Sequence, residues 1–293
     1  MLAALGRCWV AVAILMCCAC SPRYLIVQSL GSELAKQRNE AEDDLVLARE
    51  ASAFYLKLSE SLLSEIPDNA PLAAAVSGGL TQYAYAFVQF DAERMESKDA
   101  KAAQRLRERA LRLYQRAHRH AMVALERANP GITKRLESPS KGPRTALLPE
   151  QLDVAYWAAA SWGALISLSK DDPEAVPDLP LAVELARLVW EQQPDYAEGA
   201  IASLMGSFES SRPGGSTLLA TTYFDRAIVL GNGRNAGPYV AKAESVALPA
   251  GDRNAFEALL RHALLVSDAK RDLSNSVMRE RALWLLEMTD DLF

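Results

Sequence analysis

Hydrophobic residues recur along the chain at intervals of three and four positions, which predicts amphipathic α-helices over most of its length. The clearest case begins at Thr217, where Ala220, Phe224 and Ala227 form a small, large, small column at i, i+4 and i+7. Gly231-Asn232-Gly233 ends this helix, because Gly and Asn adopt a left-handed helix terminus at low cost. The same spacing predicts further helices over residues 43–66, 72–90, 100–128, 151–169, 181–193 and 238–248, after Asp195 and Asp252, and from residue 273 to the end.

The same column of small and large residues occurs at Ala110, Tyr114 and Ala117. Such a column is typical of the second helix of a tetratricopeptide hairpin, because small residues let the neighbouring helix approach closely. The anchoring alanines Ala110, Ala182 and Ala220 are 72 and 38 residues apart, whereas the standard repeat has about 34 residues. The expected fold is therefore all-α, with stacked antiparallel helix hairpins, irregular tetratricopeptide-like repeats, forming a curved helical bundle.

The first twenty residues have the composition of an export signal. An apolar run over residues 9–16 is well short of the roughly 20 residues that span a bilayer. The run is followed by Cys17-Cys18-Ala19-Cys20-Ser21, which resembles a bacterial lipoprotein box with a small residue before the acylated cysteine. Cys20 is the best candidate for lipidation, with Cys18 and Cys17 as alternatives. The competing interpretation is an uncleaved anchor or a misread start site.

These features predict a lipoprotein signal peptide at 1–19, an N-terminal tether or first helix at 20–41, and a single tetratricopeptide-like α-helical domain at 42–293. All four cysteines lie in the first twenty residues, so the mature chain has no disulfide framework, cysteine metal site or thiol nucleophile. Ser21 follows the candidate cysteine where Asp would indicate the inner membrane. The predicted location is the periplasm, with a lipid anchor in the outer membrane that does not span it.

Composition and motifs argue against catalysis and against nucleic-acid binding. The formal charge of −5 disfavours a polyanionic partner for the whole chain. The sequence has no G-x-S-x-G elbow and no G-x-x-x-x-G-K-[ST] phosphate loop. His118 and His120 are two residues apart on a predicted helix, so they point to different faces, and His262 is isolated. We expect no enzyme activity, no metal and no cofactor.

Six arginines of the predicted helix 100–128 fall within about 80° of its circumference at 100° per residue. One interpretation is a solvated face interleaved with Glu108 and Glu126. The other is a docking stripe for an acidic partner or for lipid head groups, whose binding salt would weaken. The candidate docking residues are Arg105, Arg109, Arg112, Arg116 and Arg119, with Arg127 one turn beyond Val123.

Aromatic residues are the other candidate binding feature. In tetratricopeptide arrays the first helix of each pair lines the concave side, and most of these residues lie on such helices. They could line an apolar cleft or pack in the core. The candidate ligand-binding residues are Tyr83, Phe87, Tyr156, Trp157, Trp162 and Tyr239.

Several segments together are similar to the TRAP transporter T-components, the TatT-like periplasmic lipoproteins. They are CSPRYLIVQSLGSELA, YAYAFVQFDAE, RLRERALRLYQRAHRHAMVALE, YWAAASWGALIS, YFDRAIVLGNGRNAGPYVAKAESVALPAGDRNAFEALLRHAL and RERALWLLEMTDDLF. The resemblance implies a helical-repeat lipoprotein that forms a homotrimer, with a cleft for a small hydrophobic or carboxylate ligand in each subunit. It also implies a partner, the solute-binding subunit of a tripartite transporter. The alternative is a helical scaffold for envelope proteins that binds no small molecule.

Overall fold

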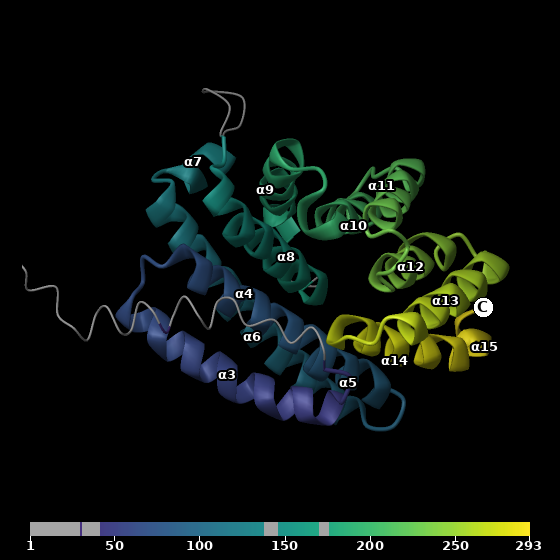
Figure 1. The fold of residues 1–293 in the computed structure, drawn as a ribbon. Coiled ribbons are helices and arrows are strands. Elements are labelled where there is room, and N and C mark those ends of the chain that lie inside the picture. Colours follow the sequence, from purple (N-terminus) through teal and green to yellow (C-terminus); the bar gives the residue numbers. More distant parts are fainter. Residues whose placement is uncertain (1–29, 31–41, 138–145, 170–175) are drawn as a thin grey trace, which may run out of the picture.

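The computed structural model describes residue 30 and residues 42–137, 146–169 and 176–293. The predicted signal peptide, the lipidation candidates and almost all of the predicted tether lie outside the described residues. Every regular element within the described ranges is a helix (Figure 1), which confirms the all-α prediction.

The elements follow one another with short connections. The α-helices are α3 (Leu45–Glu65), α4 (Ala70–Ala84), α5 (Phe90–Met95), α6 (Ala100–Ala128), α7 (Ile132–Glu137), α8 (Leu152–Leu168), α9 (Leu179–Gln192), α10 (Tyr196–Ser211), α11 (Thr217–Leu230), α12 (Gly237–Lys242), α13 (Arg253–Ala269), α14 (Leu273–Glu287) and α15 (Thr289–Leu292). The wider π-helical turns are η1 (Tyr85–Gln89) and η4 (Ala243–Ala247), and the 3-10 turns are η2 (Pro149–Gln151) and η3 (Val176–Asp178).

The long helices begin and end within a few residues of the predicted positions. The predicted Asp252 cap is confirmed, since its carboxylate accepts a hydrogen bond from the backbone N–H of Ala255 at 2.9 Å. The helix predicted to end at Phe90 continues through η1 and α5 to Met95. Its apolar pattern stops at Phe90, but the Glu, Arg and Met that follow favour helix. The short α7 was not predicted.

The start of α10 differs from the prediction, which placed a regular helix directly after Asp195. Ala197, Glu198 and Gly199 all have positive φ angles, so the chain makes a left-handed turn before the regular helix. At Gly199 a Cβ atom would lie 2.8 Å from the carbonyl oxygen of Ala227. The absence of a side chain therefore lets α10 lie directly against α11.

Each long helix packs against the next in the chain, from α3 to α14, and α14 returns to contact α3 (Figure 1). Both predicted columns are fully buried, with Phe224 and Tyr114 at their centres. The largest apolar cluster joins α4, α6, α8, α9 and α10. A second cluster joins α12, α13 and α14, and a smaller third cluster around Tyr114 joins α4 and η1 to α6. The two larger cores thus lie one toward each end of the chain.

A close approach between α4 and α8 holds the first core together. The sequence contains Gly78-Gly79 in α4, a pair that predicts close approach of a neighbouring helix. In the structure Gly78 contacts the indole of Trp157, and Gly79 contacts Leu56. A Cβ atom on Gly78 would lie 2.5 Å from Cε2 of Trp157, closer than any real contact.

We predict that Gly78→Ala destabilises the protein. Alanine favours helix by up to about 1 kcal/mol over glycine, but overpacking a core costs about 1–3 kcal/mol. Urea unfolding should therefore show a lower free energy of unfolding. Gly237→Ala is the matched control, because no atom lies within 4 Å of the Cβ position there. Adding Trp157→Leu to Gly78→Ala should relieve the clash; equal stability of Gly78→Ala and the wild type would contradict the prediction.

Candidate functional site

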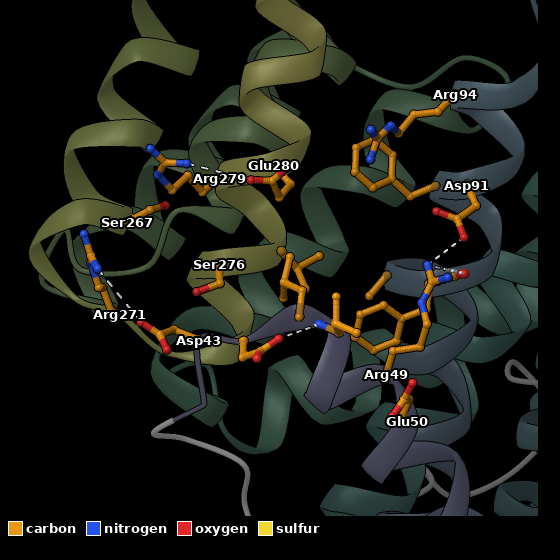
Figure 2. A pocket seen from close by; sticks show the side chains of 17 residues that line it. Asp43, Arg49, Glu50, Asp91, Arg94, Ser267, Arg271, Ser276, Arg279 and Glu280 are labelled. Atoms are coloured by element: carbon orange, nitrogen blue, oxygen red, sulfur yellow. Dashed lines mark hydrogen bonds and ion pairs between the residues drawn. The ribbon is translucent and has the colours of Figure 1, made fainter.

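An open cleft of about 930 Å³ separates α3 and α5 from α13 and α14 (Figure 2). It lies where the two ends of the helix array meet. The apolar part of its lining comes from Leu45, Val46, Ala86, Phe87, Phe90 and Val277. The charged part comes from Asp43, Asp44, Arg49, Glu50, Asp91, Arg94, Arg271, Arg279 and Glu280.

Most arginines of the cleft already have acidic partners. Arg49 donates from Nη2 to Asp91 Oδ2 at 2.6 Å and to the carbonyl of Phe87 at 3.1 Å. Arg271 lies 4.0 Å from Asp43, and Arg279 contacts Asp268 and Glu280, at 3.1 and 3.7 Å. These three cations therefore each have a neighbouring carboxylate that offsets their charge.

Arg94 is the exception among the cleft arginines. It is exposed and makes no ion pair with any residue in the described ranges. Its guanidinium lies 5.5 Å from the ring centroid of Phe90, in a cation–π contact. Arg94 therefore presents free N–H donors beside an apolar ring. A guanidinium in this state binds carboxylate or phosphate in a two-pronged geometry.

A buried cluster of charges centred on Arg281 lies directly behind the cleft. Arg281 donates to Glu244 through Nε at 2.9 Å and through Nη2 at 2.6 Å, and to Glu93 through Nη1 at 2.7 Å. Only 9% of its side chain is exposed. Its guanidinium also lies 5.4 to 5.9 Å from the ring centroids of Tyr85, Phe90 and Trp284. The cluster joins residues 188 positions apart in sequence.

The protonation states of the cluster follow from its surroundings. Burial by itself lowers the pKa of Arg281, but Tyr85, Glu244 and Glu93 outweigh it and raise the pKa well above its ordinary value. Burial also raises the pKa of the Tyr85 phenol. Arg281 is therefore permanently cationic and Tyr85 is neutral. The arginine thus provides a constant positive charge inside the structure.

The two π-helical turns supply part of the surroundings of Arg281, and α5 supplies its partner Glu93. Glu244 belongs to η4, while Tyr85 and Gln89 belong to η1. Gln89 donates to Glu93 at 3.0 Å and accepts from the hydroxyl of Tyr114 at 2.7 Å. The network thus runs from the buried column of α6 to α14. Isolated π-helical turns occur often at functional sites, because they redirect side chains that a regular helix would place elsewhere.

Phe90 connects the cleft to the Arg281 cluster. Its ring lines the cleft, stacks on Arg281 and meets Trp284 edge-on at 5.6 Å between centroids. A molecule bound in the cleft would therefore touch a ring that also packs on the buried charges. The cleft and the cluster form one site.

The structure does not bring the six predicted ligand-binding aromatics together. Phe87 lines the cleft, and Tyr83 meets it edge-on at 5.4 Å. The others make three separate contacts away from the cleft: Tyr156 with Trp157 at 4.9 Å, Trp162 with His118 at 4.5 Å, and Tyr239 with His262 at 4.5 Å. Burial raises the pKa of Tyr156 to about 12.

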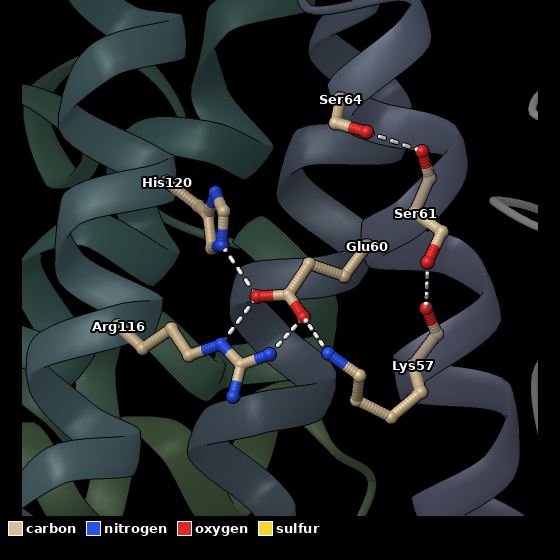
Figure 3. Close-up of polar contacts among 6 residues, drawn as sticks. All are labelled: Lys57, Glu60, Ser61, Ser64, Arg116 and His120. Atoms are coloured by element: carbon tan, nitrogen blue, oxygen red, sulfur yellow. Dashed lines mark hydrogen bonds and ion pairs between the residues drawn. The ribbon is translucent and has the colours of Figure 1, made fainter.

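The predicted arginine stripe on α6 divides into exposed and paired members. Arg105, Arg109, Arg112 and Arg119 are exposed, and Arg109 lies over the ring of Tyr83 at 5.9 Å. Arg127 is 3.7 Å from Asp68. Arg116 instead pairs with Glu60 of α3, as Figure 3 shows.

Glu60 is the acceptor at the centre of this second cluster (Figure 3). Both oxygens bind Arg116, while Lys57 Nζ and His120 Nε2 each lie 2.9 Å from a carboxylate oxygen. Burial raises the pKa of Glu60, but the hydrogen bonds from Arg116, Lys57 and His120 outweigh it and lower the pKa to about 2. Glu60 thus ties α3 to α6.

Helical periodicity did not identify Arg94, Arg281 or the two glutamates that hold Arg281. One signal for Arg281 was present in the sequence. It occupies the same column as Val277 and Leu285, both buried, at i−4 and i+4. A charged residue in an apolar column must find partners when it is buried, so this position points to an ion pair.

Two further observations concern the described residues. The described residues contain no group of three or more His, Cys, Asp or Glu side chains placed to hold a metal ion. No helix within the described ranges combines the length and apolar composition that crossing a membrane requires. The fold and the site therefore define an all-α helix array with an open cleft between its ends.

Comparison with known proteins identifies the family. The sequence model of the family described as TRAP transporter T-component matches residues 41–293. The chain belongs to this family, and the protein is an accessory component of a TRAP transporter. It is also 27% identical over 315 aligned positions to an uncharacterized protein of Treponema pallidum (strain Nichols), a match that covers 98% of this chain and 97% of the relative.

We predict that Arg281→Met destabilises the protein by about 3–5 kcal/mol, because removing one partner of a buried ion pair leaves uncompensated charge. Here Glu93 and Glu244 would face each other without a cation. Arg279→Met, two residues away and paired at the surface, should cost less than about 1 kcal/mol. Urea unfolding measures both. Equal losses in the two variants would show that the cluster does not hold the ends of the array together.

We also predict that Glu60 makes stability depend on acid pH. Its folded pKa of about 2 lies below its ordinary value of 4.5, so its contribution is present above about pH 4.5 and is lost as the pH falls toward 2. Glu60→Gln should lower stability at neutral pH and flatten the dependence in that window. Urea unfolding between neutral pH and about pH 2 tests this, with the exposed Glu50→Gln as the control. An unchanged slope in Glu60→Gln would refute the prediction.

Proposed function

We propose that the protein is a periplasmic, membrane-anchored accessory component of a TRAP transporter that binds a small hydrophobic or carboxylate ligand and the solute-binding subunit. The observation that carries the proposal is the cleft beside the Arg281 cluster, in which unpaired Arg94 lies over the ring of Phe90 and Phe87 forms another part of the wall. Family membership gives the transport context.

The cleft has the mixture of groups that small-molecule sites use. Its volume of about 930 Å³ lies within the range of about 300–1,000 Å³ typical of such sites. Phe87, Phe90 and Val277 offer apolar surface, and Arg94 offers directional donors to an anion. A molecule with an apolar body and one carboxylate satisfies both, with the carboxylate on Arg94 and the body against the rings.

The remaining parts of the proposal concern assembly and location. The chain carries a lipid on Cys20 after removal of residues 1–19, and residues 20–41 tether the helical domain 42–293 to the outer membrane. Three copies associate as a homotrimer. The protein works by binding and transfer, without a catalytic step.

A second candidate function is a helical scaffold for envelope proteins without a small-molecule ligand. The observation that favours it is exposed apolar surface away from the cleft, including Leu218 of α11 and Leu265 of α13, which are 78% and 68% exposed. The two functions differ in whether the cleft is occupied in the cell.

Native mass spectrometry of the full chain, purified in detergent from its host envelope, distinguishes them. The proposed function predicts a trimer that carries a small added mass, released on activation, and that co-purifies with the solute-binding subunit. A ligand-free monomer bound to other envelope proteins would support the scaffold instead.

We predict that Arg94→Gln weakens binding of the released compound by about tenfold or more, because a hydrogen bond to a charged group contributes about 1.5–3 kcal/mol. Titration calorimetry with the compound measures the change. Arg226→Gln is the control, since Arg226 is an exposed arginine of α11 without an ion pair to a described residue. Equal affinity of the Arg94→Gln variant and the wild type would show that Arg94 does not contribute to binding of the compound.

A further inference from the structure

Helix α6 is strongly basic in an acidic protein. Residues 100–128 contain eight Lys and Arg residues and two Glu residues, so this helix carries a formal charge of +6 while the whole chain carries −5. The remainder of the chain is therefore markedly acidic. Positive charge concentrated in this way marks one face of the molecule for an anionic partner.

Three of these arginines are free and share one side of α6. Arg105, Arg112 and Arg119 are spaced by seven residues, so they lie within about 40° of one another and extend over about 21 Å. All three are exposed, and none makes an ion pair with a residue that the structure describes. No carboxylate among the described residues neutralises their charge through an ion pair.

The neighbouring helix α3 exposes large apolar side chains. Leu47, Phe54 and Leu58 are 53%, 68% and 39% exposed, and their spacing places them within about 40° on the helix. Tyr55 is also exposed and meets Phe54 edge-on. None of these four side chains lines the cleft. Several large apolar side chains exposed on one side of a helix are typical of an interaction site.

The two helices are held beside each other. Glu60 of α3 binds Arg116 and His120 of α6, and Figure 3 shows the two helices joined through this carboxylate. The basic stripe and the apolar stripe thus belong to adjacent helices with a fixed spacing.

We propose that α3 and α6 form a membrane-facing surface that rests on an anionic lipid bilayer. The arginines contact lipid phosphates, and Leu47, Phe54 and Leu58 enter the boundary between head groups and acyl chains. Peripheral proteins bind membranes through this combination of basic and apolar groups, because basic residues close to an anionic lipid surface are attracted to it.

The distribution of charge favours a bilayer over an acidic protein as the occupant. The free arginines are spread along about 21 Å of helix, which fits a surface that presents anionic groups along its whole length. The exposed apolar side chains of α3 lie on the neighbouring helix, and a bilayer accepts them without any matching shape.

Hydroxyl-radical footprinting of the full chain in vesicles tests the proposal, because side-chain oxidation reports exposure residue by residue. One set of vesicles contains phosphatidylcholine alone, and the other adds phosphatidylglycerol. Any N-terminal anchor is the same in both sets, so the comparison isolates the surface. Oxidation of Phe54 and Leu47 should fall several-fold on the anionic vesicles, while that of Leu218 on α11 should not change.

Charge variants and salt complete the test. Arg112→Gln combined with Arg119→Gln should abolish the protection of Phe54. Arg226→Gln combined with Arg234→Gln removes the same charge from exposed positions elsewhere and should preserve it. About 1 M salt, where the Debye length is about 3 Å, should also weaken the protection.

Three results would overturn the proposal. Equal oxidation of Phe54 on neutral and anionic vesicles would exclude recognition of anionic lipid. Protection already present in detergent, before vesicles are formed, would show that a second copy or another protein covers α3. Equal loss of protection in the two arginine pairs would show a general effect of net charge.

Discussion

The arrangement of the two ends of the chain depends on one buried cation. Arg281 replaces an apolar side chain in the column of α14 and is satisfied by Glu93 from one end of the array and Glu244 from the other. Buried ion pairs add little stability compared with a well-packed apolar core, but they tolerate few alternative arrangements. Two apolar cores could pack against each other in many registers, whereas three charged side chains joined by three hydrogen bonds admit very few. The position of the cleft follows from this constraint.

Local periodicity predicted the helices because each depends on residues three and four positions apart. The buried columns at Phe224 and Tyr114, the cap at Asp252 and the close approach at Gly78 are of this kind, and the structure confirms them. The site depends on pairs such as Glu93 and Arg281, which come together only after the array has closed. The residue pattern within a single helix cannot indicate which distant residues will meet. The aromatic candidates Tyr156, Trp162 and Tyr239 were predicted from residue type alone, and they lie in separate contacts.

Different sets of helices form the cleft and the proposed membrane surface. The cleft is lined in part by α5 and α14, and the ring of Phe90 belongs both to its wall and to the Arg281 cluster. The proposed membrane surface uses α3 and α6, which are joined by Glu60. Helix α3 takes part in both, since Arg49 reaches the cleft while Phe54 faces outward. Because α3 contributes side chains to both, this amphipathic helix fixes the position of the cleft relative to the proposed membrane surface.

The two π-helical turns have a consequence for how such chains change over time. A turn closed by i to i+5 hydrogen bonds holds one more residue than an α-helical turn, so η1 and η4 each amount to a single-residue insertion. Losing that residue would rotate the positions beyond it by about 100° and separate Glu244 or Glu93 from Arg281. Relatives that keep all three charged residues but differ by one position in either turn would therefore have lost the contact between their two ends. In this chain the number of residues in each helix therefore determines the geometry of the site together with the identity of its charged residues.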